Sequence, residues 1–181
     1  MKVRRLDHVS VTTVDIERSL GFYQDLLGIP VTSVGEVSGA EVERLTGVAG
    51  TRMLIADLDL GDGQVLELIE YIAGEEGVAL PLAHPGSGHI GLTVEDLDGL
   101  YERLVAVGAR VRSEPVELTE PGAWHGVRCL TVLDPDGVSV ELVERPSEEG
   151  RTRLDAAAAS SAGSRTADEV TGGLRDQHPR G

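Results

Sequence analysis

Two stretches of the chain decide the fold: LDHVSVTTVDIERSLGFYQDLLGIPV at residues 6–31 and SGHIGLTVEDLDGLYERLVAVGARV at residues 87–111. Aligned on their histidines, they match at a series of positions: His8 with His89, Asp15 with Asp96 and, after a one-residue shift, Gly28 with Gly108. Downstream, DGQVLELIE at 62–70 matches DGVSVELVE at 136–144. Matched starts and matched ends in the same order indicate an internal duplication.

Each copy has the pattern of one strand, one helix and three further strands. Period-two alternation predicts strands, and an aspartate before a helical stripe that ends at glycine predicts a helix. The expected strands lie near 4–13, 31–37, 51–60 and 64–71, then near 88–94, 110–113, 127–133 and 138–144, and the helices near 16–27 and 97–107. An insertion at 38–50 predicts a short extra helix. The fold class is therefore α+β, with two tandem βαβββ modules whose strands are expected to combine into one curved mixed sheet.

Composition divides the chain into a domain and a tail. Residues 1–145 are expected to form the domain, with module one at about 4–72 and module two at about 86–145. Residues 146–181 contain few branched apolar residues and no aromatic ring. Such a segment buries too little surface to offset its ordering entropy, so we expect a largely disordered tail.

Charge and cysteine content exclude several classes of protein. The 181 residues carry a net charge of −15, which repels phosphate backbones and anionic lipid, so nucleic acid is not an expected partner. A single cysteine, Cys129, excludes an internal disulfide framework. No apolar run reaches the ~20 residues of a membrane span, and the start MKVRRLDHVS lacks the apolar region of a signal peptide. We therefore expect a cytoplasmic protein with no membrane partner.

The duplication singles out four residues that are typical metal ligands. His8 and His89 lie on the first strand of each module, and Glu67 and Glu141 lie on the last. If the modules pack about a pseudo-twofold axis, these side chains can converge. Two imidazoles and two carboxylates bind one divalent ion such as Zn, Ni, Co, Mn or Fe, and the residues do not select among these metals.

The paired modules with this His…Glu…His…Glu order resemble the vicinal oxygen chelate superfamily, which includes glyoxalase I, epimerases, fosfomycin-resistance enzymes, extradiol dioxygenases and bleomycin-binding proteins. The resemblance covers about residues 4–145, through LDHVSVTTVDIERSLGFYQDLLG, VLELIEY, SGHIGLTVEDLD and DPDGVSVELVE. It places His8, Glu67, His89 and Glu141 on the family's metal-ligand positions. The complete ligand set is most similar to the glyoxalase I and epimerase branches.

The resemblance implies proton abstraction next to a carbonyl, through an enediolate that the metal stabilises as a Lewis acid. Glu141 is expected to be the principal base and Glu67 the acid/base on the opposite face. The expected function is a metal-dependent epimerase or isomerase acting on a small hydroxy-ketone, sugar-derived or thioester substrate. A glyoxalase I-like lyase stays open, and so does a protein that only sequesters a small cationic drug.

Four further residues are candidates for contact with the small-molecule substrate: His125 in the loop PGAWHG at 121–126, Arg44, Arg52 and Tyr71. The arginines could hold an anionic group, although Arg44 could equally pair with Glu41. The turn Asp134-Pro135-Asp136-Gly137 is expected to act only as a turn. We expect a homodimer, with sites either within each chain or between the two chains.

Overall fold

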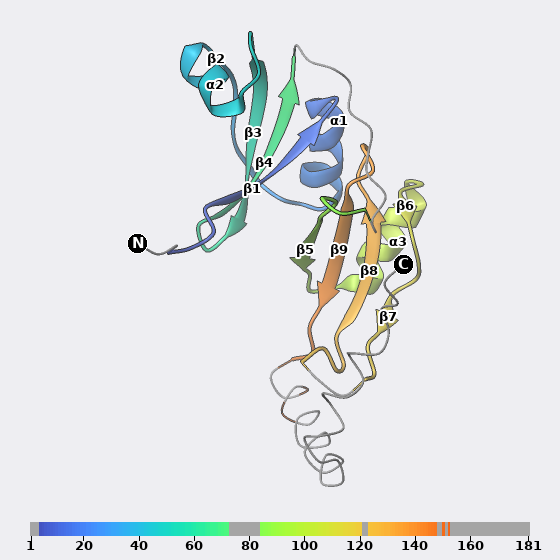
Figure 1. Ribbon diagram of the computed structural model, residues 1–181. Coiled ribbons are helices and arrows are strands. Elements are labelled where there is room, and N and C mark those ends of the chain that lie inside the picture. Colours follow the sequence, from blue (N-terminus) through green and yellow to red (C-terminus); the bar gives the residue numbers. More distant parts are fainter. Residues whose placement is uncertain (1–3, 73–83, 121–122, 148–149, 151, 153–181) are drawn as a thin grey trace, which may run out of the picture.

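The computed structural model describes residues 4–72, 84–120, 123–147, 150 and 152 (Figure 1). Module one contains β1 (His8–Thr13), α1 (Ile16–Leu20), the π-helical segment η1 (Gly21–Leu26), β2 (Val31–Ser38), α2 (Ala40–Thr46), β3 (Arg52–Gly61) and β4 (Gln64–Tyr71). Module two contains β5 (His89–Thr93), α3 (Leu97–Ala106), β6 (Arg110–Val111), β7 (Val116–Glu117), β8 (Arg128–Leu133) and β9 (Ser139–Glu144). The α+β class and the βαβββ order of both modules are confirmed. The short strand β7 was not expected from the sequence, and most of the predicted tail lies outside the described residues.

The strands form two sheets, in the orders β1-β4-β3-β2 and β5-β9-β8-β6, with β7 paired to β8. Among the described strands, β1 and β5 each pair on one side only, so the strands do not join into the single sheet that the sequence suggested. The two sheets nevertheless repeat one register. His8 lies opposite Val65 as His89 lies opposite Ser139, and both pairs belong to parallel ladders. The alignment made from the sequence is therefore a structural equivalence.

The helix starts repeat as well. The Asp15 carboxylate accepts a hydrogen bond from the backbone N–H of Arg18 (3.0 Å), and Asp96 accepts one from Gly99 (2.9 Å). A second carboxylate reaches each helix start from the last strand of its module. Glu70 accepts from the N–H of Ile16 (2.8 Å), and Glu144 accepts from the N–H of Leu97 (3.1 Å). These carboxylates accept hydrogen bonds from N–H groups of the first helical turn, which have no acceptor within the helix.

The first helix differs from the expected regular helix over 16–27. It changes to π-helical turns at Gly21, and the N–H of Leu27 donates to the carbonyl of Phe22 (3.0 Å). The wider turn buries two consecutive aromatic residues, Phe22 and Tyr23, whose rings meet edge to face at 5.0 Å. Tertiary packing of these rings outweighs the α-helical preference of the segment.

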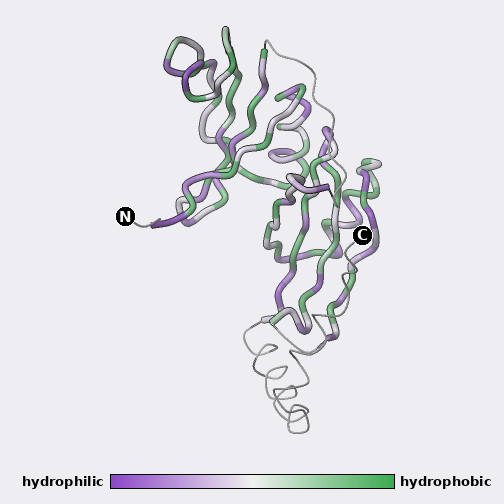
Figure 2. The backbone as a smooth tube through the Cα atoms, viewed as in Figure 1, coloured by the Kyte–Doolittle hydropathy of each residue, from purple (hydrophilic) through white to green (hydrophobic). Residues whose placement is uncertain are grey.

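The apolar core is shared by the two modules. Alternate residues of the inner strands, such as Leu66 and Leu68 on β4 and Val140 and Leu142 on β9, are buried in one cluster with side chains of α1, η1 and α3. Figure 2 shows these hydrophobic segments recurring along the strands of both modules. The residues between them, including Glu67 and Glu141, point to the opposite face of each sheet. No helix in the described part of the chain is long and apolar enough to cross a membrane.

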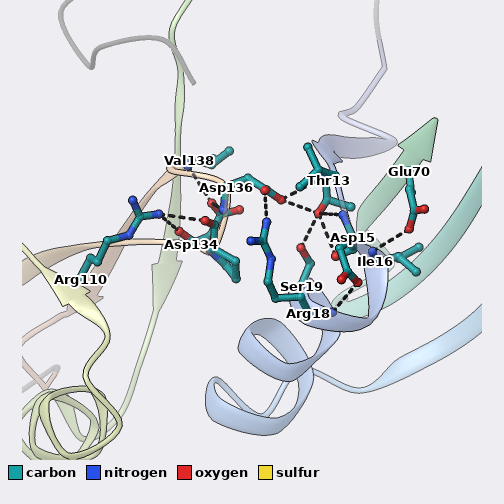
Figure 3. Close-up of polar contacts among 12 residues, drawn as sticks. Thr13, Asp15, Ile16, Arg18, Ser19, Glu70, Arg110, Asp134, Asp136 and Val138 are labelled. Carbon is teal, nitrogen blue, oxygen red and sulfur yellow. Dashed lines mark hydrogen bonds and ion pairs between the residues drawn. The ribbon is translucent and has the colours of Figure 1, made fainter. Parts of the chain in front are cut away.

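A polar network fastens the β8–β9 turn of module two to the start of module one (Figure 3). The Tyr23 hydroxyl donates to the fully buried Asp134 carboxylate (2.9 Å), which also accepts from the N–H groups of Asp136 and Val138. The Asp136 carboxylate accepts from the Thr13 hydroxyl and pairs with Arg18. The Asp-Pro-Asp-Gly turn therefore does more than reverse the chain, which corrects the sequence interpretation. It holds the two modules in one arrangement.

Replacement of Tyr23 by Phe is expected to lower the free energy of unfolding by about 1 kcal/mol at neutral pH, through loss of one hydrogen bond. Burial, followed by the nearby Asp134 carboxylate, holds the pKa of Tyr23 well above its usual range. The unfolded chain loses this proton above about pH 10 while the folded chain keeps it, so stability falls as pH rises beyond that point. The wild type loses stability in this way and Tyr23→Phe does not. The difference between their free energies of unfolding should therefore shrink above about pH 10.

Urea unfolding at several pH values measures this effect. Tyr101→Phe is the matched control, because no hydrogen bond of the Tyr101 hydroxyl is found among the residues that the structure describes. If the difference in free energy of unfolding between wild type and Tyr23→Phe stays constant through the alkaline range, the buried Tyr23–Asp134 contact does not have the effect described.

Candidate active site

Module two holds one half of the predicted ligand set. His89 on β5 and Glu141 on β9 lie on the open face of the sheet, with Nε2 of His89 3.5 Å from Oε2 of Glu141. Gly91 lies directly opposite Glu141, and a β-carbon added there would be 3.9 Å from Oε2. The absence of a side chain at Gly91 leaves space beside the carboxylate. The imidazole is about half exposed (55%) and the Glu141 side chain less so (28%).

Module one holds the other half, with a different local environment. Glu67 on β4 lies opposite Ser10 on β1, and the Ser10 hydroxyl donates to Oε1 of Glu67 (2.8 Å). His8 is two residues before Ser10 on the same face, and its Nδ1 lies 3.2 Å from the Asp7 carboxylate. An imidazole whose Nδ1 contacts a carboxylate presents Nε2 as the free ring nitrogen, the usual arrangement for a metal-binding histidine.

The structure places the four predicted ligands in two His–Glu pairs, one on each module. His89 and Glu141 are in contact, whereas His8 and Glu67 share one face of the neighbouring strands β1 and β4 with two residues between their registers. Within its described residues, no group of three or more His, Cys, Asp or Glu side chains is close enough to hold a metal ion. Two imidazoles and two carboxylates suit a borderline divalent metal by their chemistry, but a single pair supplies too few donors. The donor set fits a metal only if the two pairs converge.

A pocket of about 460 Å³ lies between the unpaired edges of β1 and β5. Ser10 and Thr12 line it from module one, and Ser87, His89 and Ser139 line it from module two. Polar side chains from both halves of the duplication therefore face one cavity. A small molecule could contact both modules there.

Cys129 on β8 belongs to the same face as Glu141. Burial, followed by the nearby Glu141 carboxylate, raises the pKa of the thiol. The sequence interpretation of Cys129 as a small buried hydrophobic residue is therefore incomplete. The thiol is half-buried and protonated next to a predicted ligand.

The predicted substrate residues lie in more ordinary surroundings. Arg44 pairs with Glu41 at 3.6 Å on α2, and Arg52 pairs with Glu36 at 3.0 Å across β2 and β3. His125 contacts the Thr119 carbonyl (2.9 Å). Tyr71 is half-buried at the end of β4. None of these contacts joins the four residues to the His–Glu pairs in the described part of the chain.

Sequence reasoning missed a polar row on the open face of module one. Four residues lie opposite one another across successive strands: Ser10 on β1, Glu67 on β4, Asp57 on β3 and Ser33 on β2. The Ser33 hydroxyl donates to Oδ2 of Asp57 (2.8 Å), as Ser10 does to Glu67. Ser10 could have been found from its two-residue spacing to His8. The register that places Asp57 and Ser33 beside Glu67 is visible only in the folded sheet.

Comparison with known proteins gives relatives with two kinds of named activity. The chain is 32% identical over 145 residues to a 2-epi-5-epi-valiolone epimerase from Actinomyces sp., covering 77% of this chain and 79% of that protein. It is 26% identical over 153 residues to a probable lactoylglutathione lyase from Synechocystis sp., covering 78% of this chain and 95% of the relative.

Solved structures show the same fold. A glyoxalase family protein from Bacillus cereus superposes with a TM-score of 0.70 at 24% identity, over 81% of this chain and 97% of the other. The family model described as Glyoxalase/Bleomycin resistance protein/Dioxygenase superfamily matches residues 5–142. This match includes nearly all of both modules, so the chain belongs to the glyoxalase/bleomycin resistance protein/dioxygenase superfamily, as the duplicated His and Glu positions indicated.

Proposed function

We propose that this protein is a divalent-metal-dependent epimerase or isomerase that moves a proton next to the carbonyl of a small hydroxy-ketone or sugar-derived ketone. The observation that carries the proposal is the repeated pair: His8 with Glu67, and His89 with Glu141, at equivalent registers on duplicated sheets. The 32% identical relative named as an epimerase supports this branch of the superfamily.

His8, Glu67, His89 and Glu141 would hold the metal ion. When bound, the ion would act as a Lewis acid on the carbonyl of the substrate. The ligand set suits Zn, Ni, Co, Mn or Fe, and availability often decides among them.

We further propose that the four ligands converge between two copies of the chain. The common core and the Asp134 network hold the modules of one chain with their His–Glu pairs separate. Convergence within one chain would require that packing to break. In a twofold dimer, the pair on module one of each copy can instead meet the pair on module two of the other, giving two equivalent sites.

The two glutamates have different restraints, which suits different roles. Glu67 accepts a hydrogen bond from the Ser10 hydroxyl, whereas Glu141 lies 3.5 Å from the His89 ring and has open space over Gly91. We assign Glu141 as the principal base, since it is freer to move toward a substrate proton. Glu67 would return or remove a proton on the opposite face of the planar intermediate.

A glyoxalase I-like lyase is the second candidate, and several relatives named as lactoylglutathione lyases favour it. It shares the proton transfer and differs in substrate, which would be the adduct of a ketoaldehyde and a thiol. Conversion of the methylglyoxal–glutathione adduct, compared with solvent exchange on hydroxy-ketones, separates the two. A protein that binds such ligands without exchange would instead be a sequestering protein.

Metal analysis of the purified protein tests the proposal first. We expect about one divalent ion per chain, and loss of nearly all of it in a His8→Ala, His89→Ala double variant, because two of the four donors are removed. His125→Ala is the control, since that ring contacts the Thr119 carbonyl and should leave the metal content unchanged. Absence of metal, with no uptake when Ni, Co, Mn or Zn is supplied, would overturn the proposal.

A further inference from the structure

The open face of module one carries a carboxylate that the proposed proton transfer does not use. Asp57 lies directly opposite Glu67 in the β3–β4 ladder, half-buried on the same face of the sheet. Residues opposite each other in this way have β-carbons about 4.5–5.5 Å apart. Two carboxylates at this spacing repel each other, and no basic side chain of the described residues pairs with Asp57.

The hydrogen bonds on these carboxylates leave one oxygen of each available. Ser33 donates to Oδ2 of Asp57, and Ser10 donates to Oε1 of Glu67. The other oxygens, Oδ1 of Asp57 and Oε2 of Glu67, accept no hydrogen bond from the residues that the structure covers. Ser33 on β2 and Ser10 on β1 fix the orientation of the two carboxylates. Asp57 therefore presents an oriented acceptor oxygen beside Glu67, the proposed proton-transfer group.

Module two has no counterpart of Asp57. The equivalent position opposite Glu141 is Thr131, which is neutral. The duplication keeps the metal-ligand positions in both modules but places a second carboxylate on module one only. A structural role common to the fold would not need this difference, whereas recognition of an asymmetric substrate would.

The next row of the face is apolar. Ile69 on β4 lies opposite Ile55 on β3, and Met53 lies opposite Tyr71 one row further along. A ligand placed over this boundary would set carbon–hydrogen surface on the isoleucines and hydroxyl groups on Asp57. This combination of an apolar surface and a hydrogen-bond acceptor suits a polyhydroxylated carbon skeleton.

We propose that Asp57 is a specificity residue that accepts a hydrogen bond from a substrate hydroxyl group, and so selects polyhydroxylated ketones. The inference rests on the proposed function for its reaction and deepens it by naming the substrate class. Asp57 binds a hydroxyl away from the reacting carbon, while Glu67 and Glu141 act on the proton. A hydrogen bond to a charged acceptor discriminates strongly against an analogue without the hydroxyl.

Two cyclic ketones test the assignment. scyllo-Inosose is a fully hydroxylated six-membered ketone, and 2-hydroxycyclohexanone keeps only the carbonyl and its neighbouring hydroxyl. We expect the purified protein to bind scyllo-inosose more tightly in an NMR titration. Asp57→Asn should weaken that binding by about tenfold, and leave 2-hydroxycyclohexanone within about twofold. The amide oxygen of the new side chain can still accept from Ser33, so the sheet is preserved.

Asp25→Asn is the charge-matched control, because Asp25 is an exposed residue of η1, and it should change neither affinity. The assignment is overturned if the wild type shows no preference for scyllo-inosose, or if Asp57→Asn weakens both ligands equally or neither. Hydrogen–deuterium exchange on the same ketones reports the proposed function separately. Preferential binding of scyllo-inosose without hydrogen–deuterium exchange would contradict the proposed function and support the role of Asp57. Exchange that Asp57→Asn leaves without a change in binding would support the proposed function and contradict the role of Asp57.

Discussion

Mixing two inactive variants, His8→Ala and Glu141→Ala, is expected to restore metal binding and proton exchange. If the four ligands converge between copies, a mixed dimer has one site with both lesions and one site with neither. Random exchange of subunits makes about half of the dimers mixed, so about a quarter of all sites should be intact. Metal content and exchange rate should both recover to about that fraction of the wild-type value.

A pair of variants from the same module provides the control. His8→Ala mixed with Glu67→Ala should recover nothing, because every site then contains one damaged copy of module one. Subunit exchange can be verified with chains of different mass. If exchange occurs and His8→Ala with Glu141→Ala still shows no recovery, the sites lie within single chains and the two-copy arrangement is wrong.

Glu67→Gln and Glu141→Gln are each expected to lower the rate of epimerisation by about 100- to 10,000-fold while leaving the metal bound. An amide oxygen can remain a ligand, but it cannot take a proton. Each variant keeps the base on one face of the substrate. Each should therefore still exchange the proton of one epimer with D2O, without converting it to the other, and the two variants should accept opposite epimers.

NMR in D2O distinguishes exchange from conversion in a single sample. Glu102→Gln, an exposed position on α3, is the control and should behave as the wild type. Two glutamine variants with full epimerase activity would show that neither carboxylate transfers the proton. Identical behaviour of the variants toward both epimers would exclude the two-face assignment, even if both were slow.

Local signals predicted most of the fold. Asp15 and Asp96 start their helices as their position before an apolar stripe indicated, because an N-cap needs only a short polar side chain three residues from an N–H group. The Gly61-Asp62-Gly63 turn uses positive φ at all three residues, a conformation that glycine adopts freely and aspartate more readily than most other residues. The π-helical η1 was not predictable, because burial of Phe22 and Tyr23 in the core shared by the two modules determines it.

The sequence named the residues of the candidate site, and their role as metal ligands stays a prediction. Parity along each strand correctly placed Glu67 and Glu141 on the face opposite the core. Arg44 and Arg52, in contrast, were selected for their charge alone, and each has a nearby acidic partner. A charged side chain pairs with whichever opposite charge the fold brings close, and sequence distance does not reveal that neighbour.

The sequence by itself determined the duplication, the α+β modules and the equivalence of His8 with His89 and of Glu67 with Glu141. These features depend on periodicity and on turn residues, which act over a few positions. Only the tertiary structure decided that the two His–Glu pairs stay separate in one chain, that Asp134 is buried against Tyr23, and that Asp57 lies beside Glu67. Those relations depend on strand register and on packing between segments up to 123 residues apart, where burial of the common core selects the arrangement.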